Sequence, residues 1–283
     1  MKIVVFGAGR IGSTLAFCLA GAGHELSVVA RGERLAALRR EGAIVAVDGR
    51  RAPVAALPEL APGLTCDLLI VTLAEHQLAP VLPDIAASQA KTILFMFNTF
   101  KGTEPYSSMV GAGRFAFGFP NMTAFLTNQR LRFRVDGPGM MTTLSSPELV
   151  ALFKDAGMPG ECEPDMDAFL RSHVALAVPL FVAGLLTWQR KHDLTWAEAR
   201  QLDGALAEGF ELVRSLGHPL KPGNVAWLAR MPSLARTGLL WAFSRSRLVK
   251  DVGEFGPLET RHLIDDMVAT APDRTRRLRA LRP

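Results

Sequence analysis

Cysteine is scarce in this sequence, which carries only Cys18, Cys66 and Cys162 among its 283 residues. The three are widely spaced and form no CxxC pair, so neither a disulfide framework nor a zinc or other metal site is predicted. A reducing compartment fits this composition. No series resembling a secretory signal precedes the β-like run Lys2–Phe6, and we therefore expect a cytoplasmic protein.

The sequence also lacks an apolar run long enough to cross a bilayer. Its longest run covers residues 174–186 and is interrupted by Pro179 and Gly184, whereas a membrane-spanning helix needs about 20 apolar residues. We interpret the run as a buried core helix and expect no membrane partner.

Low hydrophobicity and a large excess of one charge, which are typical of disordered chains, are absent too. The composition is 49% hydrophobic and 21% charged, as in globular proteins, and the length favours two domains. Part of the net charge of +5 comes from arginines near the end, at positions 274, 276, 277, 279 and 282. No aromatic platform or recognition motif accompanies them, so we expect a solvated helix or tail and no nucleic-acid partner.

What the first half does contain is a series of short, nearly continuous apolar runs, which is typical of a parallel sheet flanked by helices. We predict strands at residues 2–6, 25–30, 67–73, 92–97, 114–118, 131–135 and 140–144, and helices at residues 11–22 and 146–156. The second of these helices would be capped by Ser146, which precedes Pro147.

The second half is helical in pattern almost throughout, with its longest candidate helices at residues 167–191, 195–216 and 257–270. Between residues 158 and 165 the chain is rich in proline, glycine and acidic residues, as linkers often are. The sequence therefore predicts a Rossmann-type doubly wound α/β domain over residues 1–163 and an all-helical domain over residues 164–283.

A glycine-rich GxGxxG segment, residues 7–12, joins the first predicted strand to the first predicted helix. Its first glycine permits a tight turn, its second lets the backbone approach a diphosphate, and its third lets helix and strand pack closely. The diphosphate would lie against the amides of the helix N-terminus, although a glycine-rich turn without a ligand is the alternative. The predicted cofactor-binding residues are Gly7, Gly9, Arg10, Ile11, Gly12 and, at the end of the third strand, Thr72 and Leu73.

The end of the second predicted strand is followed by Arg31, where NAD-binding proteins usually place an acidic side chain that holds the ribose 2′-hydroxyl. A guanidinium can fork onto a 2′-phosphate, so Arg31 predicts NADP(H) as the cofactor, with Arg34 and Arg10 as helpers. Glu33 is the competing observation, because its carboxylate could face a ribose.

These segments resemble the ketopantoate reductase (2-dehydropantoate 2-reductase) family. The likeness begins with MKIVVFGAGRIGSTLA and GHELSVVARG and continues through DLLIVTLAEHQ to Asn98; it returns with Leu248-Val249-Lys250-Asp251 and Glu259. The resemblance implies hydride transfer from NADPH to the keto carbon of a 2-oxo acid in the cleft between the domains. It also implies that Asn98 lies near the nicotinamide and that Glu259 binds the substrate hydroxyl.

The general-acid lysine of the family falls, by register, at Arg171 in this sequence. An arginine cannot readily donate its proton, so Arg171 is predicted to neutralise a developing alkoxide or to clamp a carboxylate. The proton would come from water or from His173, although residues two apart lie on different sides of a helix. Ser246 and Asp251 complete the predicted substrate side, with helix capping as their alternative role.

Other positions where the family carries Asn, Lys or Gly also differ, and they hold Ala74, Thr99, Ala175 and Pro179. We therefore expect a homodimeric reductase whose small-molecule substrate is a 2-oxo acid or a related carbonyl compound. Ketopantoate and other compounds of this class both stay open as the substrate. Arg171 motivates an alternative, a protein that binds NADP(H) without catalysis and reports redox state to a partner. A third hypothesis is a dehydrogenase of hydroxy or amino acids.

Overall fold

The computed structural model of the protein describes residues 1–137, 139–246, 249 and 257–283. By its contacts the chain divides into two compact units, one of residues 1–97 and 103–166 and one of residues 98–102 and 167–283. The later division lies close to the boundary that the sequence predicts after residue 163. The short segment Asn98–Gly102, however, belongs by its contacts to the second unit.

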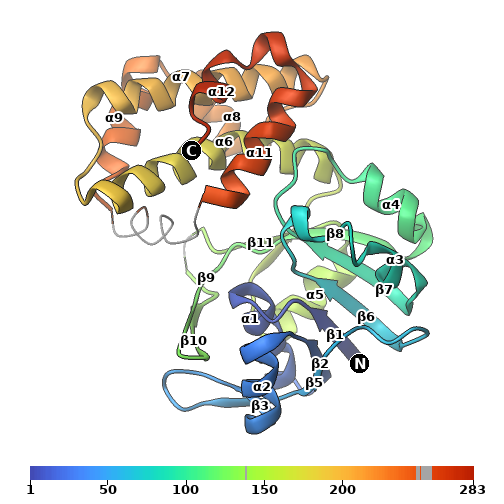
Figure 1. Ribbon diagram of the computed structural model, residues 1–283. Coiled ribbons are helices and arrows are strands. Elements are labelled where there is room, and N and C mark those ends of the chain that lie inside the picture. Colours follow the sequence, from blue (N-terminus) through green and yellow to red (C-terminus); the bar gives the residue numbers. More distant parts are fainter. Residues whose placement is uncertain (138, 247–248, 250–256) are drawn as a thin grey trace. The chain divides into compact units, whose positions relative to one another are not determined.

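The first unit is built on an eight-stranded sheet with the order β12-β11-β8-β7-β6-β1-β2-β5 (Figure 1). Neighbouring strands pair in parallel, except that β11 runs antiparallel to β8. The strands are β1 (Lys2–Phe6), β2 (Glu25–Val29), β5 (Ala55–Leu57), β6 (Thr65–Val71), β7 (Gln89–Met96), β8 (Phe115–Phe119), β11 (Thr142–Leu144) and β12 (Gly160–Cys162). This topology confirms the predicted doubly wound α/β fold, whose strand order reverses on either side of β1.

Helices and two hairpins complete the first unit. The helices are α1 (Arg10–Gly21), α2 (Gly32–Glu41), α3 (Leu82–Ala87), α4 (Glu104–Val110) and α5 (Pro147–Asp155), with short 3-10 turns η1 (Glu75–Gln77) and η2 (Ala112–Arg114). Ser146 caps α5 as predicted, since its hydroxyl accepts from the Leu149 amide at 3.3 Å. The two hairpins pair β3 (Ala43–Val45) with β4 (Arg51–Pro53), and β9 (Thr123–Thr127) with β10 (Arg130–Arg134).

The core of the first unit explains why the central strands are almost continuously apolar. Ile3 and Val5 of β1 are fully buried and belong to the same cluster as Leu15 and Leu19 of α1. Because both faces of a parallel sheet are covered, the residues between them, such as Val4, are fully buried as well. The core therefore holds the carboxyl end of β1 and the start of α1 in a defined place.

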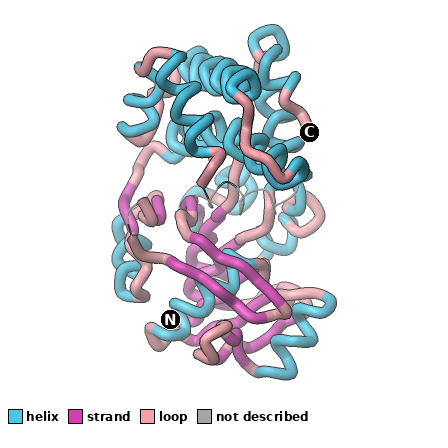
Figure 2. Tube along the Cα trace, turned by 90° about the vertical axis from the view of Figure 1, so that its left-hand side faces the viewer, coloured by secondary structure: helices cyan, strands magenta, loops and turns pink. Residues whose placement is uncertain are grey.

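The second unit consists, in its described part, of helices and connecting loops (Figure 2). They are α6 (Met166–Arg190), α7 (Trp196–Ser215), α8 (Gly223–Arg230), α9 (Ser233–Phe243), α11 (Pro257–Thr270), the 3-10 turn η3 (Pro272–Arg274) and α12 (Arg276–Ala280). By length and composition alone α6 could cross a membrane. Its apolar side chains Val174 and Val178 are nevertheless fully buried in the core of this unit, together with Phe100.

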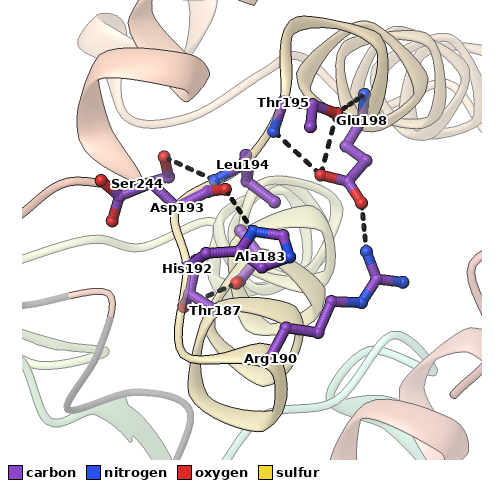
Figure 3. A network of polar contacts seen from close by, with 9 residues as sticks. All are labelled: Ala183, Thr187, Arg190, His192, Asp193, Leu194, Thr195, Glu198 and Ser244. Carbon is purple, nitrogen blue, oxygen red and sulfur yellow. Dashed lines mark hydrogen bonds and ion pairs between the residues drawn. The ribbon is translucent and has the colours of Figure 1, made fainter.

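The connection between α6 and α7 is held by polar contacts at both of its sides (Figure 3). Thr195 and Glu198 form a capping box, in which the Thr195 hydroxyl accepts from the Glu198 amide at 3.3 Å and the Glu198 carboxylate accepts from the Thr195 amide at 2.9 Å. Arg190, near the end of α6, pairs with the same carboxylate. The Ser244 hydroxyl, just after α9, accepts from the Leu194 amide at 3.2 Å, so the turn is fastened to three helices.

Candidate functional site

The glycine-rich turn follows the carboxyl end of β1 and requires glycine at two positions. Gly7 has a φ of +115°, and a Cβ at this residue would lie 2.8 Å from the Thr72 hydroxyl oxygen. At Gly12 a Cβ would lie 1.9 Å from the Gly7 carbonyl oxygen, so α1 can approach β1 only without a side chain there. The roles that the motif predicts for its first and third glycines are therefore visible as contacts.

The N-terminus of α1 is open to an anion. Gly9 is its N-cap and has no side chain that could cap the helix, and the first turn carries no acidic residue. The first-turn amides have no acceptor within the helix, and the helix dipole adds partial positive charge at the same place. The turn and the helix start therefore fit a diphosphate.

A cavity of about 680 Å³ lies beside this turn and is lined by residues of the first unit alone. Of the predicted cofactor-binding residues, Gly7, Gly9, Arg31 and Leu73 line it, together with the predicted helper Arg34. The remaining lining residues are Phe6, Ala8, Val29, Ala30, Gln77, Pro80, Val81, Leu126, Asn128 and Gln129. The cavity thus runs from the glycine-rich turn to Ala30 and Arg31, the two residues that follow β2.

Not every predicted contact lines this cavity. The first-turn residues of α1, Arg10, Ile11 and Gly12, lie outside the lining. Thr72, which follows β6, lies outside it as well, and its hydroxyl donates to the Gly7 carbonyl at 3.0 Å. Thr72 thereby supports the turn. Glu33, the competitor of Arg31, is exposed on the first turn of α2 and does not line the cavity.

In the second unit the structure brings together two of the predicted site residues. The Asn98 amide nitrogen Nδ2 donates to Oε1 of Glu259 at 2.8 Å, although 161 positions separate the residues. The other amide atom, Oδ1 of Asn98, is buried and has no hydrogen-bond partner among the described residues. A buried acceptor left without a partner costs about 1–3 kcal/mol, so this oxygen fits a ligand hydroxyl or amide donor.

Arg171 lies on α6, and its guanidinium contacts the backbone of the segment that carries Asn98. Its Nη2 donates to the Lys101 carbonyl at 2.9 Å and its Nη1 to the Phe100 carbonyl, and Asp167 lies 3.8 Å from Nη2. Gly102 completes this contact, because a Cβ there would lie 2.6 Å from Nη2. The arginine fork is therefore used to hold residues 98–102, and the predicted role of Arg171 toward a substrate stays a prediction.

His173 and Ser246 have local partners. Burial lowers the pKa of His173 to about 4, and its ring stacks on Phe169 with centroids 6.2 Å apart. The imidazole is therefore neutral near pH 7 and a poor proton donor. The Ser246 hydroxyl accepts from the Val249 amide at 3.4 Å, a spacing typical of helix caps. Leu248, Lys250 and Asp251 of the resemblance lie outside the described residues.

Sequence reasoning missed the contribution of the β9–β10 hairpin to the cavity. It predicted a strand at residues 131–135 but not its partner β9, and so it did not place Leu126, Asn128 and Gln129. A signal was present, because asparagine between two strand-like runs favours a tight hairpin turn. Which side of this turn faces the cavity depends on tertiary packing and is not encoded in adjacent residues.

The fold and the glycine-rich turn define a Rossmann-type α/β protein with a helix start that fits an anion and a separate helical unit. Within this class the chain belongs to the ketopantoate reductase PanE/ApbA family, whose model matches residues 3–144.

Curated relatives match shorter stretches. The chain is 43% identical over 89 residues to a 2-dehydropantoate 2-reductase of Mesorhizobium japonicum. This stretch covers 30% of this chain and 27% of that relative. The chain is 38% identical over 94 residues to a D-amino acid dehydrogenase of Cereibacter sphaeroides, which is 33% of this chain and 21% of that relative. The matched stretch thus spans less than a third of either relative.

Solved structures match along nearly the whole chain. A PanE/ApbA family ketopantoate reductase from Ralstonia eutropha JMP134 is 18% identical with a TM-score of 0.76, and the match covers 100% of this chain and 96% of that one. D-mandelate dehydrogenase in complex with NADH is 14% identical with a TM-score of 0.72, covering 99% and 96%. At these identities the likeness establishes the fold.

Proposed function

We propose that this protein is a cytoplasmic NADP(H)-dependent reductase that transfers a hydride to the keto carbon of a 2-oxo acid or a related carbonyl compound. The observation that carries the proposal is the cavity that joins the glycine-rich turn to Arg31 while excluding Glu33 from its lining. Family membership and a related 2-dehydropantoate 2-reductase support the reductase activity. A similarly folded dehydrogenase described with NADH supports a nicotinamide dinucleotide as the cofactor.

The residues present fit a nicotinamide dinucleotide, whose bound reduced form would supply the hydride. Gly7, Gly9 and the first amides of α1, including those of Arg10 and Ile11, would hold the diphosphate against the helix dipole. Arg31 would pair with the 2′-phosphate, and Leu73 would cover the apolar part of the cofactor.

The substrate side is assigned to residues of the second unit. Glu259 and the unpartnered Oδ1 of Asn98 would accept hydrogen bonds from a hydroxyl of the substrate or of the alcohol product, because both are acceptors and already lie side by side. We also propose Arg171 and Ser246 as substrate contacts. The proton that must reach the new alcohol oxygen would come from water, because a guanidinium does not release one near neutral pH.

The proposal predicts carbonyl-dependent oxidation of NADPH. A panel of 2-oxo acids that includes ketopantoate, pyruvate and phenylglyoxylate is followed by the loss of NADPH absorbance, with alcohol formation as the second readout. Turnover of at least one member is the expected result. A protein that binds NADPH and turns over none of them would contradict the reductase proposal.

Cofactor selectivity supplies a second prediction. Arg31→Ala is expected to weaken NADPH binding by roughly 10- to 100-fold, since a charge-assisted hydrogen bond is worth about 1.5–3 kcal/mol, and to leave NADH binding within about twofold. Titration calorimetry with both dinucleotides measures the two affinities. Glu33→Ala is the control, because Glu33 is exposed two positions away. A selective loss of NADH affinity in Glu33→Ala would contradict the assignment.

A second candidate function is a non-catalytic NADP(H)-binding sensor. It is favoured by Arg171, which by register of the sequence falls at the lysine of the family and whose guanidinium donates to two backbone carbonyls. This candidate predicts nucleotide binding without turnover and a gain of NADPH oxidation in Arg171→Lys. Turnover of any carbonyl compound by the unchanged protein would exclude it.

A further inference from the structure

The β9–β10 hairpin forms one wall of the cavity beside the glycine-rich turn. Leu126, Asn128 and Gln129 line the cavity together with Arg31, yet none of the three belongs to the glycine-rich motif or to the segment that follows β2. A ligand that reaches from the turn to Arg31 therefore passes the tip of this hairpin.

The body of the hairpin is anchored to the first unit. Leu131 is fully buried, and its carbonyl accepts from the Val47 amide at 2.9 Å. The Phe133 ring lies 5.2 Å from the Phe17 ring of α1, and the Arg50 guanidinium lies 5.5 and 5.6 Å from the two rings. Figure 1 shows the hairpin beside α1. Its position is therefore set by packing, and its tip faces the cavity together with Leu126 of β9.

The two residues of the tip have positive φ angles, which residues other than glycine rarely adopt. Asn128 and Gln129 have φ values of 50° and 64°, the left-handed pair that a two-residue hairpin turn between twisted strands requires. Asparagine tolerates this region, whereas glutamine is disfavoured there. Such a conformation persists only where surrounding contacts fix it, and it is common where a chain contacts a ligand.

Arg34 supplies those contacts from α2. Its Nη1 donates to the Gln129 carbonyl at 2.8 Å, its Nε to the Ala8 carbonyl at 3.2 Å, and its Nη2 to the Ser13 hydroxyl at 3.0 Å. Ala8 lies in the glycine-rich turn and Ser13 in the first turns of α1. One partly buried guanidinium thus ties together the turn, the helix start and the hairpin tip. A guanidinium presents its donors in a rigid planar fork, which can match three acceptors fixed at different places in this way.

We propose that the hairpin tip is a contact surface for the adenosine half of the dinucleotide, and that Arg34 is the positioning residue that fixes this tip against the glycine-rich turn. The inference rests on the proposed function. It assigns different roles to two neighbouring arginines that the sequence alone groups together. Arg31 binds the 2′-phosphate, and Arg34 positions a wall of the cavity that contacts NADPH and NADH alike. The side-chain amides of Asn128 and Gln129 both donate and accept, as ribose hydroxyls and an adenine edge require.

The chain offers a matched control for Arg34. Arg114 likewise directs its guanidinium to backbone acceptors of the first unit, the carbonyls of Ala86, Ser88 and Val110, but it does not line the cavity. Arg34→Met and Arg114→Met therefore remove comparable sets of hydrogen bonds, one at the cavity and one away from it. A double variant, Asn128→Gly with Gln129→Gly, keeps the turn and removes only its side chains.

The experiment measures, for each variant of the full chain, the melting temperature and the affinities for NADPH, NADH and adenosine 2′,5′-bisphosphate. Arg34→Met is expected to weaken all three ligands by similar factors of at least about tenfold. Arg114→Met is expected to lower the melting temperature comparably and to keep all affinities within about twofold. The double glycine variant is expected to weaken adenosine 2′,5′-bisphosphate by about threefold or more without a lower melting temperature.

Two outcomes would overturn the inference while the proposed function stands. In one, Arg34→Met loses NADPH and keeps NADH, which would make Arg34 a phosphate ligand like Arg31. In the other, the double glycine variant binds adenosine 2′,5′-bisphosphate as tightly as the unchanged protein. An unchanged protein that binds neither dinucleotide would instead overturn the proposed function, and the inference with it.

Discussion

Gly12→Ala is expected to lower the affinity for NADPH by at least about 100-fold and the free energy of unfolding by roughly 3 kcal/mol. The new Cβ would lie 1.9 Å from the Gly7 carbonyl oxygen and 2.5 Å from the Thr72 hydroxyl, and neither group is the end of a flexible side chain. Helix α1 must therefore move away from β1, and displacements near 1 Å at a binding site can cost on the order of 100-fold. Calorimetric titration and urea unfolding measure the two effects.

The control for this substitution lies in the same helix. A Cβ at Gly21, the last residue of α1, meets no atom within 4 Å. Gly21→Ala is therefore expected to keep NADPH affinity and to stabilise the protein by about 0.5–1 kcal/mol at most, because alanine loses less backbone entropy on folding. Equal NADPH affinity in Gly12→Ala and Gly21→Ala would refute the close approach of α1 to β1 as the basis of binding.

Arg236→Ala is expected to cost about 3–5 kcal/mol of the free energy of unfolding. The Asp203 side chain on α7 is 2% exposed, and the guanidinium of Arg236 on α9 donates to it at 2.6 Å. Removing the arginine leaves a carboxylate charge buried without its cation, and the Met231 carbonyl loses its donor as well. Urea unfolding, followed by helical circular dichroism, measures the loss.

Arg282→Ala provides the matched comparison, because Arg282 makes a similar two-point contact with Asp265 at 2.7 and 3.0 Å on the surface. That pair is about half exposed and is expected to contribute only about 0–1 kcal/mol. The double variant Asp203→Leu with Arg236→Met is expected to recover most of the stability, since no charge is then buried alone. Equal losses in Arg236→Ala and Arg282→Ala would contradict the role of burial.

Periodicity predicted much of the fold, because burial imposes a pattern on adjacent residues. The first strand, Lys2–Phe6, and the late helix Pro257–Thr270 have the predicted bounds. Helix starts with a local cap, such as Ser146, were equally readable. The short edge strands β5 and β12 were missed, since three residues carry too little alternation to distinguish a strand from a loop.

The candidate site was predictable only in part, and Arg34 illustrates the limit. Its proximity to Arg31 in sequence suggested a shared phosphate, whereas the structure assigns its guanidinium to the Ala8 and Gln129 carbonyls and the Ser13 hydroxyl. Every residue carries a backbone carbonyl, so residue types do not indicate which carbonyl will accept a hydrogen bond from a side chain. The same reason hid the bonds from Arg171 to Phe100 and Lys101.

By itself the sequence determined the alternation of strands and helices in the first unit and the glycine-rich turn. These depend on sterics and burial within a few consecutive residues, as the positive φ of Gly7 illustrates. Only the tertiary structure decided that Asn98 meets Glu259 and that Arg34 joins a helix to a hairpin tip. Such contacts join residues far apart in the chain, and long side chains have many rotamers, so the packed fold alone selects their partners.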